Sequence, residues 1–470
     1  MTKPLPFELD RSAKTSLAEQ IRRGISAAID NGALAPGARL PSWRDLAVQL
    51  GVARGTVRTA YERLTDAQLI VSSKSAGTHV AQRPVKTKAP PEGPPDRGSI
   101  LGILFRDFTR GPALFQMGVP AADCFPTKLF ARIRAHTVRA ETASPASYPD
   151  PRGEGILRRE IAAHLAIARG VTCSPAQILV TAGFTGALGL ALHALGLEGR
   201  TAWMEDPGFP LTRRGLEVAR LAPVPIPVDD RGLDVGYGLQ HAPDAALAMV
   251  TPGQQAPLGS TLSLERRVRL LAWAARTGAW IIEDDYLGEL QLKGRAAPAL
   301  ASLDTAGRVI HIGSFSKTIS ATLRLGFLVV PSALVERFTE VAACLAPAPG
   351  PSVQLATAEF MREGHYMRHL RRTKRVYAGR RDALKACLEA RRMDAVSTGL
   401  AIVLRLPNGA RDTDIAREAT AYGLAPVPLS PWYMSPEWSR SGLLLGVATT
   451  PDEGLAQACA RLHGLVERFA

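Results

Sequence analysis

The sequence predicts a large α/β domain preceded by a small helical domain. The main support is a pair of short apolar segments, residues 280–282 and 309–312, which have the length of buried strands and run into polar residues. The N-terminal region instead shows apolar residues at helical spacing, and a proline-rich segment follows it. We therefore expect a small domain over residues 1–82, a linker over 83–112 and a large domain over 113–470.

The composition is that of an ordinary globular protein. At 470 residues the chain can bury a large core, and 46% of its residues are hydrophobic against 21% charged. The formal net charge of +14 favours an acidic partner. We find no apolar run of membrane-spanning length and no apolar signal core near Met1, so we expect a cytoplasmic protein without membrane contact.

Five cysteines lie far apart in the sequence and form no CxxC pair. This pattern is typical of a reducing compartment and argues against a disulfide framework or a zinc site. No metal is therefore expected.

Helical periodicity is clear in the N-terminal region. Three successive segments carry apolar residues every three or four positions: Leu17, Ile21, Ile25 and Ile29; Leu46, Ala47 and Leu50; Val57, Tyr61 and Leu64. Ser42, with Asp45 three residues later, predicts the start of the second helix. Residues 69–71 and 78–81 predict the two strands of a hairpin. The region thus predicts three helices and a hairpin.

Three motifs in this region, LPSWRDLA at 40–47, LGVARGTVRTAY at 50–61 and GTHV at 77–80, resemble the pattern of the GntR family. The resemblance implies a winged helix-turn-helix domain that binds double-stranded operator DNA. In such domains the start of the second helix of the motif meets base edges, and other contacts go to the backbone or the minor groove. The residues expected to meet base edges are Arg54, Thr56, Arg58 and Thr59. The residues expected to contact the DNA backbone or the minor groove are Arg39, Ser42, Arg44, Gly77, Thr78 and His79. The alternative for these arginines is a solvated basic face.

Residues 83–112 contain repeated prolines among charged residues, with little to bury over 83–98. Such a segment should be extended and exposed. It can tether two domains without fixing their orientation.

Lys317 follows the predicted strand 309–312, with Ser314 and Ser316 before it and Arg324 after it. A lysine amine forms a Schiff base with an aldehyde. Hydroxyls and a guanidinium group suit a phosphate dianion. The combination indicates a phosphorylated aldehyde, although an isolated lysine is more often an exposed loop residue.

The end of a second predicted strand strengthens the case for a phosphorylated aldehyde. The strand 280–282 runs into Glu283, Asp284, Asp285 and Tyr286. A carboxylate at this place can pair with a pyridinium nitrogen and keep the ring an electron sink. Asp284 is the candidate, and Tyr286 is a candidate for bonding the ring hydroxyl.

The two motifs, in this order, resemble the fold type I aminotransferase class, and with the N-terminal region they resemble the MocR/GabR-type bacterial regulators. The resemblance implies pyridoxal 5′-phosphate as cofactor and a mixed, mostly parallel sheet with helices on both faces and a small C-terminal α+β lobe. It also implies a homodimer in which the DNA-binding domain of one subunit lies near the large domain of the other. The expected function is a transcription regulator that senses an amine or amino acid, or the cofactor itself. The alternative is an active aminotransferase with an appended DNA-binding domain.

Further cofactor contacts are expected in the order of the chain. Gly183, Phe184 and Thr185 begin an apolar helix after a strand, and such a start binds anions. The resemblance implies that Phe209 stacks on the pyridine ring, unless it is a core residue. It also implies that Tyr148 reaches the cofactor phosphate of the partner subunit, unless it only covers a turn.

The effector side departs from the aminotransferase pattern. Aminotransferases commonly place asparagine before the proline of the segment 251–259, where this chain has Ala256 after Gln254 and Gln255. The final strand, residues 441–447, contains no arginine for a substrate carboxylate. Both departures favour a sensor over an efficient transaminase. The candidate effector-binding residues are Arg213, Arg214 and Gln254.

Overall fold

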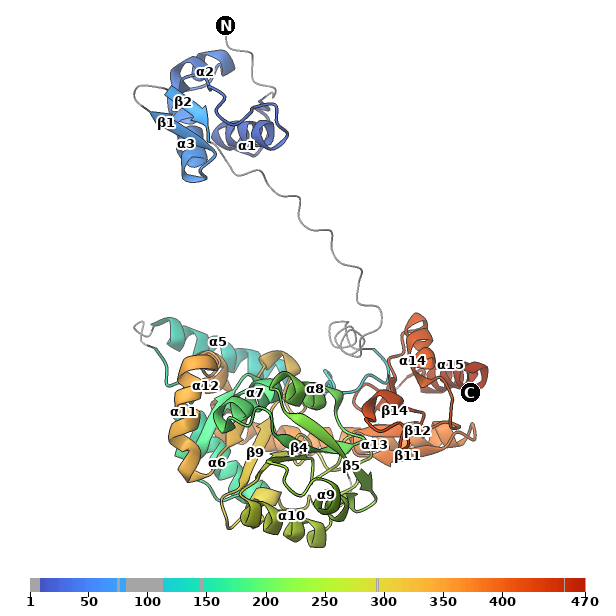
Figure 1. The fold of residues 1–470 in the computed structure, drawn as a ribbon. Helices are drawn as coiled ribbons and strands as arrows, with labels where there is room; N and C mark the ends of the chain where they lie inside the picture. The colour runs from blue at the N-terminus through green and yellow to red at the C-terminus, as the bar shows by residue number, and fades with distance from the viewer. Residues whose placement is uncertain are drawn as a thin grey trace. The chain divides into compact units, whose positions relative to one another are not determined.

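The computed structural model describes residues 9–73, 77–81, 113–143, 148–292, 294, 296–451 and 453–469. The chain divides into two compact units, Met1–Arg97 and Gly98–Ala470, each considered by itself (Figure 1). The division falls inside the predicted linker, which lies outside the described residues, so the expected domain limits stay predictions. None of the helices described is long and apolar enough to cross a membrane.

Over its described residues the N-terminal unit contains three helices, α1 (Leu17–Asp30), α2 (Trp43–Leu50) and α3 (Arg54–Asp66). An antiparallel hairpin of β1 (Ile70–Ser73) and β2 (Gly77–Val80) follows (Figure 1). The predicted arrangement is confirmed, although the strand ends differ from the predicted ones by one residue, and by two at the end of β1.

One small core holds this unit together. Ile21, Ile25, Val57 and Leu64 are completely buried. The buried Tyr61 hydroxyl donates a hydrogen bond to Pro41 O over 2.9 Å, so its polar end is satisfied. The inward faces predicted from helical spacing are therefore the faces that pack.

The large unit is built on an eight-stranded sheet (Figure 1). The strands are, in spatial order, β3 (Ile178–Thr181), β10 (Gly326–Val329), β9 (Val309–Ser314), β8 (Trp280–Asp284), β7 (Leu247–Val250), β4 (Thr201–Asp206), β5 (Ala222–Asp229) and β6 (Gly232–Leu233). From β9 to β5 all neighbours are parallel, whereas β10 and β6 are antiparallel to their neighbours. The predicted mixed, mostly parallel sheet is confirmed.

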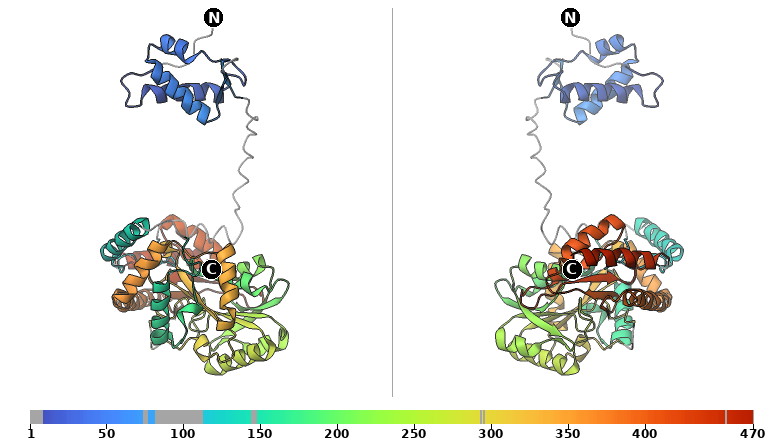
Figure 2. Two further views of the ribbon diagram at one scale, coloured as in Figure 1. Left: turned by 90° about the vertical axis from the view of Figure 1, so that its left-hand side faces the viewer. Right: turned by 90° about the vertical axis from the view of Figure 1, so that its right-hand side faces the viewer.

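Helices cover both faces of this sheet, as Figure 2 shows. They are α5 (Thr127–Ala143), α6 (Gly155–Arg169), α7 (Gly183–Leu195), α8 (Pro210–Val218), α9 (Val235–His241), α10 (Leu264–Thr277), α11 (Val335–Leu345), α12 (Pro351–Arg362) and α13 (His365–Glu389). Because side chains alternate along a strand, Leu179 and Leu328 pack with α7 and α11, while Ile178 and Phe327 pack with α6 and α12. Strands buried on both faces explain their uniformly apolar sequences.

A smaller lobe completes the large unit. Its antiparallel sheet has the order β11 (Ala395–Thr398), β12 (Ala401–Arg405), β14 (Gly442–Gly446) and β13 (Val427–Pro428). Two helices, α14 (Asp412–Ala419) and α15 (Leu455–Phe469), belong to it (Figure 1). Single 3-10 turns are η1 (Pro175–Gln177), η2 (Leu300–Leu303), η3 (Ala321–Leu323), η4 (Ser332–Leu334), η5 (Thr420–Tyr422) and η6 (Ser430–Trp432). The predicted α+β lobe is confirmed.

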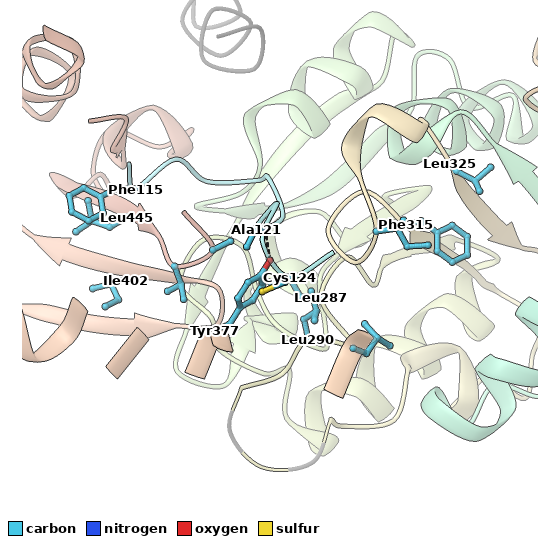
Figure 3. Close-up of a cluster of buried hydrophobic side chains, with 14 of the residues drawn as sticks. Phe115, Ala121, Cys124, Leu287, Leu290, Phe315, Leu325, Tyr377, Ile402 and Leu445 are labelled. Carbon is cyan, nitrogen blue, oxygen red and sulfur yellow. Dashed lines mark hydrogen bonds between the residues drawn. The ribbon is translucent and has the colours of Figure 1, made fainter. Parts of the chain in front are cut away.

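The segment that enters the large unit connects this lobe with the sheet. Phe115 packs with Leu445, and Phe115 O accepts a hydrogen bond from Gly446 N over 2.7 Å. Further along, Ala121 N donates to the Tyr377 hydroxyl on α13 over 2.8 Å (Figure 3). The segment is thus held at both ends, which places its middle beside Lys317.

Candidate functional site

Lys317 follows β9 and points its amine into the protein. Its Nζ donates a hydrogen bond to Gly118 O over 2.5 Å. Burial lowers the pKa of Lys317 to about 8, although the nearby Asp284 acts in the opposite direction. A nucleophilic amine must be unprotonated, so this surrounding raises the reactive fraction near neutral pH.

Asp284 is the last residue of β8, the strand next to β9 in the sheet. Burial, followed by the charges of Asp285 and Glu205, raises the pKa of Asp284 to about 8, while Lys317 lowers it. No donor among the described residues reaches its carboxylate. A buried carboxyl group without a donor is costly, and an N–H group of a ligand would satisfy it.

The two acids on either side of Asp284 are already paired. Asp285 accepts two hydrogen bonds from the Arg169 guanidinium, over 2.6 and 3.0 Å. Glu283 accepts from Leu300 N over 2.6 Å and lies 3.0 Å from His311 Nδ1. Of the three consecutive acids, Asp284 therefore remains as the one that can bind a ligand.

A group of donors suited to an anion lies at the start of α7. Arg324 Nη2 donates to Thr185 Oγ1 over 2.9 Å and to Ala182 O over 3.1 Å. Gly183 has φ of +75°, and a Cβ there would lie 3.6 Å from Arg324 Cζ. The first backbone N–H groups of a helix have no partner within the helix, so the guanidinium and these groups can share an anion.

The two serines near Lys317 belong to the same edge of the sheet. In the strand register, Ser314 of β9 and Thr181 of β3 both lie opposite Gly326 of β10. Ser316 N donates to Ser314 Oγ over 3.2 Å. A Cβ at Gly326 would come within 3.0 Å of Gly183 Cα, so only glycine lets these strands bring the groups together.

Aromatic residues lie near this edge. Phe209 is half-buried, with its ring centroid 6.5 Å from that of Phe184 and 5.6 Å from that of Trp432. Burial, followed by the charge of Asp284, raises the pKa of the Tyr286 hydroxyl, which keeps it neutral. Tyr148 is fully exposed, so it contributes nothing to this cluster within its own chain.

A buried polar network behind Lys317 was not predicted from the sequence. The Tyr366 hydroxyl donates to the carboxylate of Glu289 and lies 3.1 Å from Thr318 Oγ1. His164 Nε2 lies 2.5 Å from Glu289 Oε1, and His369 Nε2 donates to Thr318 O over 2.6 Å. Because Thr318 follows Lys317, the network fixes the backbone of the lysine. The spacing of Tyr366 and His369 on one helix face was the available signal.

Glu205, at the end of β4, is a second buried acid that sequence reasoning missed. It accepts from Thr251 N over 3.0 Å and from Thr251 Oγ1 over 2.5 Å, and lies 3.4 Å from Gln255 Nε2. Burial raises the pKa of Glu205 to about 7, and these hydrogen bonds oppose the shift. The network braces the segment that carries Ala256.

The candidate effector residues differ in burial and in their partners. Arg213 is half-buried and donates to Tyr433 O over 3.2 Å, whereas Arg214 is exposed and pairs with Glu217 over 2.7 Å. Gln254 is buried, and a Cβ on Gly399 of the C-terminal lobe would overlap its amide. Of the two arginines, Arg213 therefore faces the interior.

The second helix-turn-helix helix, α3, begins without a side-chain cap at Ala53. Arg54 is exposed and makes no ion pair with any described residue, whereas Arg58 pairs with Glu62 over 2.8 Å. Thr56 and Thr59 are half-buried on the same helix. An uncapped helix start beside a free guanidinium can bind a phosphate group.

The remaining candidate DNA contacts lie around the hairpin and the start of α2. Arg39 forms an isolated β-bridge with His79, and its Nε lies 3.5 Å from the place a Cβ would take on Gly77. Ser42 caps α2 by accepting from Asp45 N over 3.2 Å, and Arg44 lies 4.9 Å from the centroid of the Trp43 ring. Arg39, Gly77 and His79 are therefore brought together from distant sequence positions.

The hydroxyl of the remaining hairpin candidate, Thr78, is already engaged. Its Oγ1 lies 3.0 Å from Ser72 Oγ on the opposite strand. The hydroxyl pair ties the two strands together beside Gly77.

Comparisons with known proteins find a family match for the large domain and another for the N-terminal domain. Residues 121–462 match the family model for aminotransferase class I and II, and residues 17–80 match that for bacterial regulatory proteins of the gntR family. An archaeal alanine:glyoxylate aminotransferase is similar in structure, with a TM-score of 0.72 and 24% identity over 79% of this chain and 96% of that one. The fold and site define a fold type I aminotransferase-like domain joined to a winged helix-turn-helix domain.

Relatives that match most of the chain define the family more closely. The probable rhizopine catabolism regulatory protein MocR of Rhizobium meliloti is 34% identical over 94% of this chain and 92% of its own length. The pyridoxine biosynthesis regulator PdxR of Corynebacterium glutamicum is 32% identical over 83% of this chain and 82% of its own. The chain belongs to the MocR-type family of helix-turn-helix transcriptional regulators.

Proposed function

We propose that this regulator holds pyridoxal 5′-phosphate on Lys317 and uses it to sense an amine, an amino acid or the cofactor itself. The main support is the pair of Lys317 and Asp284, which lie at the carboxyl ends of neighbouring parallel strands and whose pKa values both lie near 8. In open α/β sheets ligands bind at the carboxyl ends of the strands.

The residues present suit the parts of this cofactor. When bound, it supplies an electrophilic aldehyde on an electron-withdrawing ring. Lys317 is the residue that binds it covalently. Asp284 meets the ring nitrogen, Tyr286 the ring hydroxyl and Phe209 the ring face. The phosphate group is held by Gly183, Phe184, Thr185, Ser314, Ser316 and Arg324, with Tyr148 supplied by the partner of a homodimer.

Each of these side chains has a defined task in the proposal. The lowered pKa of Lys317 leaves its amine free to form the covalent bond. Asp284 holds charge only when a donor compensates it, so its buried position selects a ligand with an N–H group. Arg324, fixed by Thr185, presents its remaining N–H groups to a dianion.

The effector side supports a sensor more than an efficient aminotransferase. Strand β14 is entirely buried and carries no arginine, and Arg440 before it is exposed. Arg213 is then the candidate anchor for an effector carboxylate. Gln254, packed on Gly399, connects the site with the C-terminal lobe. An effector that prefers one position of this lobe would shift the population of conformations.

The readout proposed for this sensor is binding to double-stranded operator DNA. Arg54, Thr56, Arg58 and Thr59 would meet base edges. The contacts with the backbone or minor groove are assigned to Arg39, Ser42, Arg44, Gly77, Thr78 and His79. Exposed cations around an uncapped helix support this assignment.

The test is substitution of the lysine. Lys317→Ala should abolish the absorbance of covalently bound cofactor, because no other amine replaces the lysine. Lys385→Ala removes a lysine that pairs with Glu389 on α13, and should keep that absorbance. Unchanged absorbance in Lys317→Ala would remove the assignment.

A second candidate is an active aminotransferase with an appended DNA-binding domain, favoured by the complete set of ring-binding residues. Mixing the cofactor-loaded protein with candidate amines and a keto acid separates the two. Sustained turnover supports the enzyme, and a spectral change that stops after one equivalent supports the sensor. If the cofactor alone changes operator binding and no amine does, the protein senses cofactor supply.

A further inference from the structure

Two cysteines that are distant in the sequence meet in the C-terminal lobe. Cys387 lies near the end of α13 and Cys459 lies on α15, two helices that contact each other. The Cys387 Sγ is 4.0 Å from Leu455 O, the carbonyl that precedes Cys459 by one helical turn. Cys387 also acts on the Cys459 thiol, whose pKa it raises. The two cysteines therefore lie close together on adjacent helices.

The two thiols differ in accessibility. Cys387 is half-buried and Cys459 is completely buried. Burial, reinforced by the nearby Cys387 side chain, raises the pKa of the Cys459 thiol to about 12. Cys459 therefore stays protonated, and a small solute from solvent meets Cys387 first.

A fixed cation lies against the accessible sulfur. Arg391 Nη1 lies 3.2 Å from the Cys387 Sγ and donates to Cys387 O over 2.9 Å, while its Nη2 donates to Ala456 O over 2.9 Å. These two carbonyls orient the guanidinium. The thiolate is the reactive form of cysteine, and a neighbouring cation stabilises it.

We propose that Cys387 and Cys459 are a reversible dithiol–disulfide pair that reacts with hydroperoxides. Arg391 stabilises the attacking thiolate and Cys459 resolves the oxidised product. The site lies apart from Lys317 and does not depend on the proposed cofactor. In a reducing compartment, such disulfides are usually transient and serve redox sensing.

The reaction has two balanced steps. The Cys387 thiolate attacks one oxygen of the hydroperoxide and the O–O bond breaks. The sulfur becomes a sulfenic acid, oxidised by two electrons, and the other oxygen leaves as an alcohol or water after taking a proton. The Cys459 sulfur then attacks the Cys387 sulfur, an S–S bond forms, the S–O bond breaks and water leaves with the thiol proton. Two equivalents of an external thiol restore the dithiol by exchange.

The product would be a covalent link between α13 and α15. The same helix α13 carries Tyr366 and His369 near its other end, where they hold the residue after Lys317. Oxidation therefore acts on a helix that reaches from the C-terminal lobe to the lysine.

The experiment uses the full chain, reduced and then treated with hydrogen peroxide under native conditions. We expect the intact mass to fall by two hydrogen atoms, two of the five thiols to disappear, and peptide mapping to link Cys387 with Cys459. Dithiothreitol should restore both thiols. A link between two chains, or oxidation of other cysteines while this pair stays reduced, would overturn the proposal.

Variants separate the roles. In Cys459→Ser the reaction should stop at a sulfenic acid on Cys387 that a dione reagent traps, and in Cys387→Ser no disulfide should form. Cys344→Ser removes an exposed cysteine on α11 and should leave the link unchanged.

Arg391→Leu should slow the first step by roughly tenfold, with Arg391→Lys recovering part of the rate. Equal rates in wild type and Arg391→Leu would contradict the role of the cation. The wild-type peptide map decides the pair itself even where a variant does not fold.

Discussion

Charged side chains are buried around Lys317 but exposed in the N-terminal unit. Around Lys317 the ionisable groups are buried, and this burial brings the pKa values of Lys317 and Asp284 together, both to about 8. In the N-terminal unit Arg54 is exposed and pairs with no described acid, and the Arg58 side chain, 69% exposed, has one partner on the same helix.

The difference agrees with what each region is proposed to bind. A covalent bond to an amine requires a neutral nucleophile in a fixed position, which burial and a rigid sheet provide. Binding to DNA phosphates draws on the release of counterions, which hydrated surface cations provide without a fixed geometry. Substitutions should therefore act through protonation and stability in the first region and through salt-dependent affinity in the second.

The largest effect is expected at Asp284. In Asp284→Asn the ring nitrogen of the proposed cofactor loses its carboxylate, and cofactor affinity should fall by about 100-fold, or ~3 kcal/mol. Spectroscopic titration of the cofactor-free protein measures it. If the affinity stays within twofold of wild type, Asp284 does not meet the cofactor ring.

The same variant should have the opposite effect on stability without cofactor. The pKa of Asp284 is raised to about 8 in the folded protein, so its favourable contribution is complete at acidic pH and is lost as the pH rises towards 8. Asp284→Asn removes that loss. The free energy of unfolding of Asp284→Asn, measured by chemical denaturation, should exceed that of wild type more at pH 8 than at pH 5, by an amount on the order of 1–3 kcal/mol.

Asp285→Asn is the matched comparison for this effect on stability. It removes the partner of the buried Arg169 guanidinium and should destabilise the protein by roughly 3 kcal/mol. Two neighbouring acids in one segment should thus change stability in opposite directions. A gain in stability in both variants would contradict the difference in pairing described above.

The strand ends were predictable from the sequence, because a buried strand is short, apolar and followed by polar residues. Asp284 and Lys317 come together since neighbouring parallel strands bring their carboxyl ends to one edge. The three helices and hairpin of the N-terminal unit were predictable for a similar reason. Their apolar spacing and the Ser42 cap are local signals that need no tertiary contact.

The side chains that support the site were not predictable in this way. Glu289, His164 and Tyr366 come from three separate segments, and their partners are decided only when α6 and α13 pack. Glu205 is bound by Thr251 and Gln255 across two strand ends. Tertiary pairing of this kind leaves no periodic pattern in the sequence, whereas burial on a strand or helix does.

A smaller effect is expected in the N-terminal unit. Arg54→Ala removes an exposed cation at the start of α3 and should weaken binding to a promoter fragment roughly tenfold, with a salt slope lower by about one if the contact is to phosphate. Arg58→Ala should lose less, because Glu62 already competes for this guanidinium. Electrophoretic shifts at several salt concentrations measure both.

Arg22→Ala, on α1 and paired with Glu19, is the control for these two variants and should keep wild-type affinity. Equal losses in all three variants would mean that only the overall positive charge of the unit matters. A loss in Arg22→Ala alone would place the DNA on another face.

The smallest effect is expected from removing one buried hydroxyl in each region. Tyr366→Phe removes one of the two donors to Glu289, leaving His164, and also removes the partner of the Thr318 hydroxyl; it should cost about 1 kcal/mol of stability. Because Thr318 follows Lys317, cofactor affinity should fall as well, by roughly threefold. Tyr61→Phe removes the hydroxyl that donates to Pro41 O in the N-terminal core and should cost a similar stability there without changing cofactor affinity. If both variants change cofactor affinity equally, or neither does, the network behind Lys317 has no special part in holding the lysine.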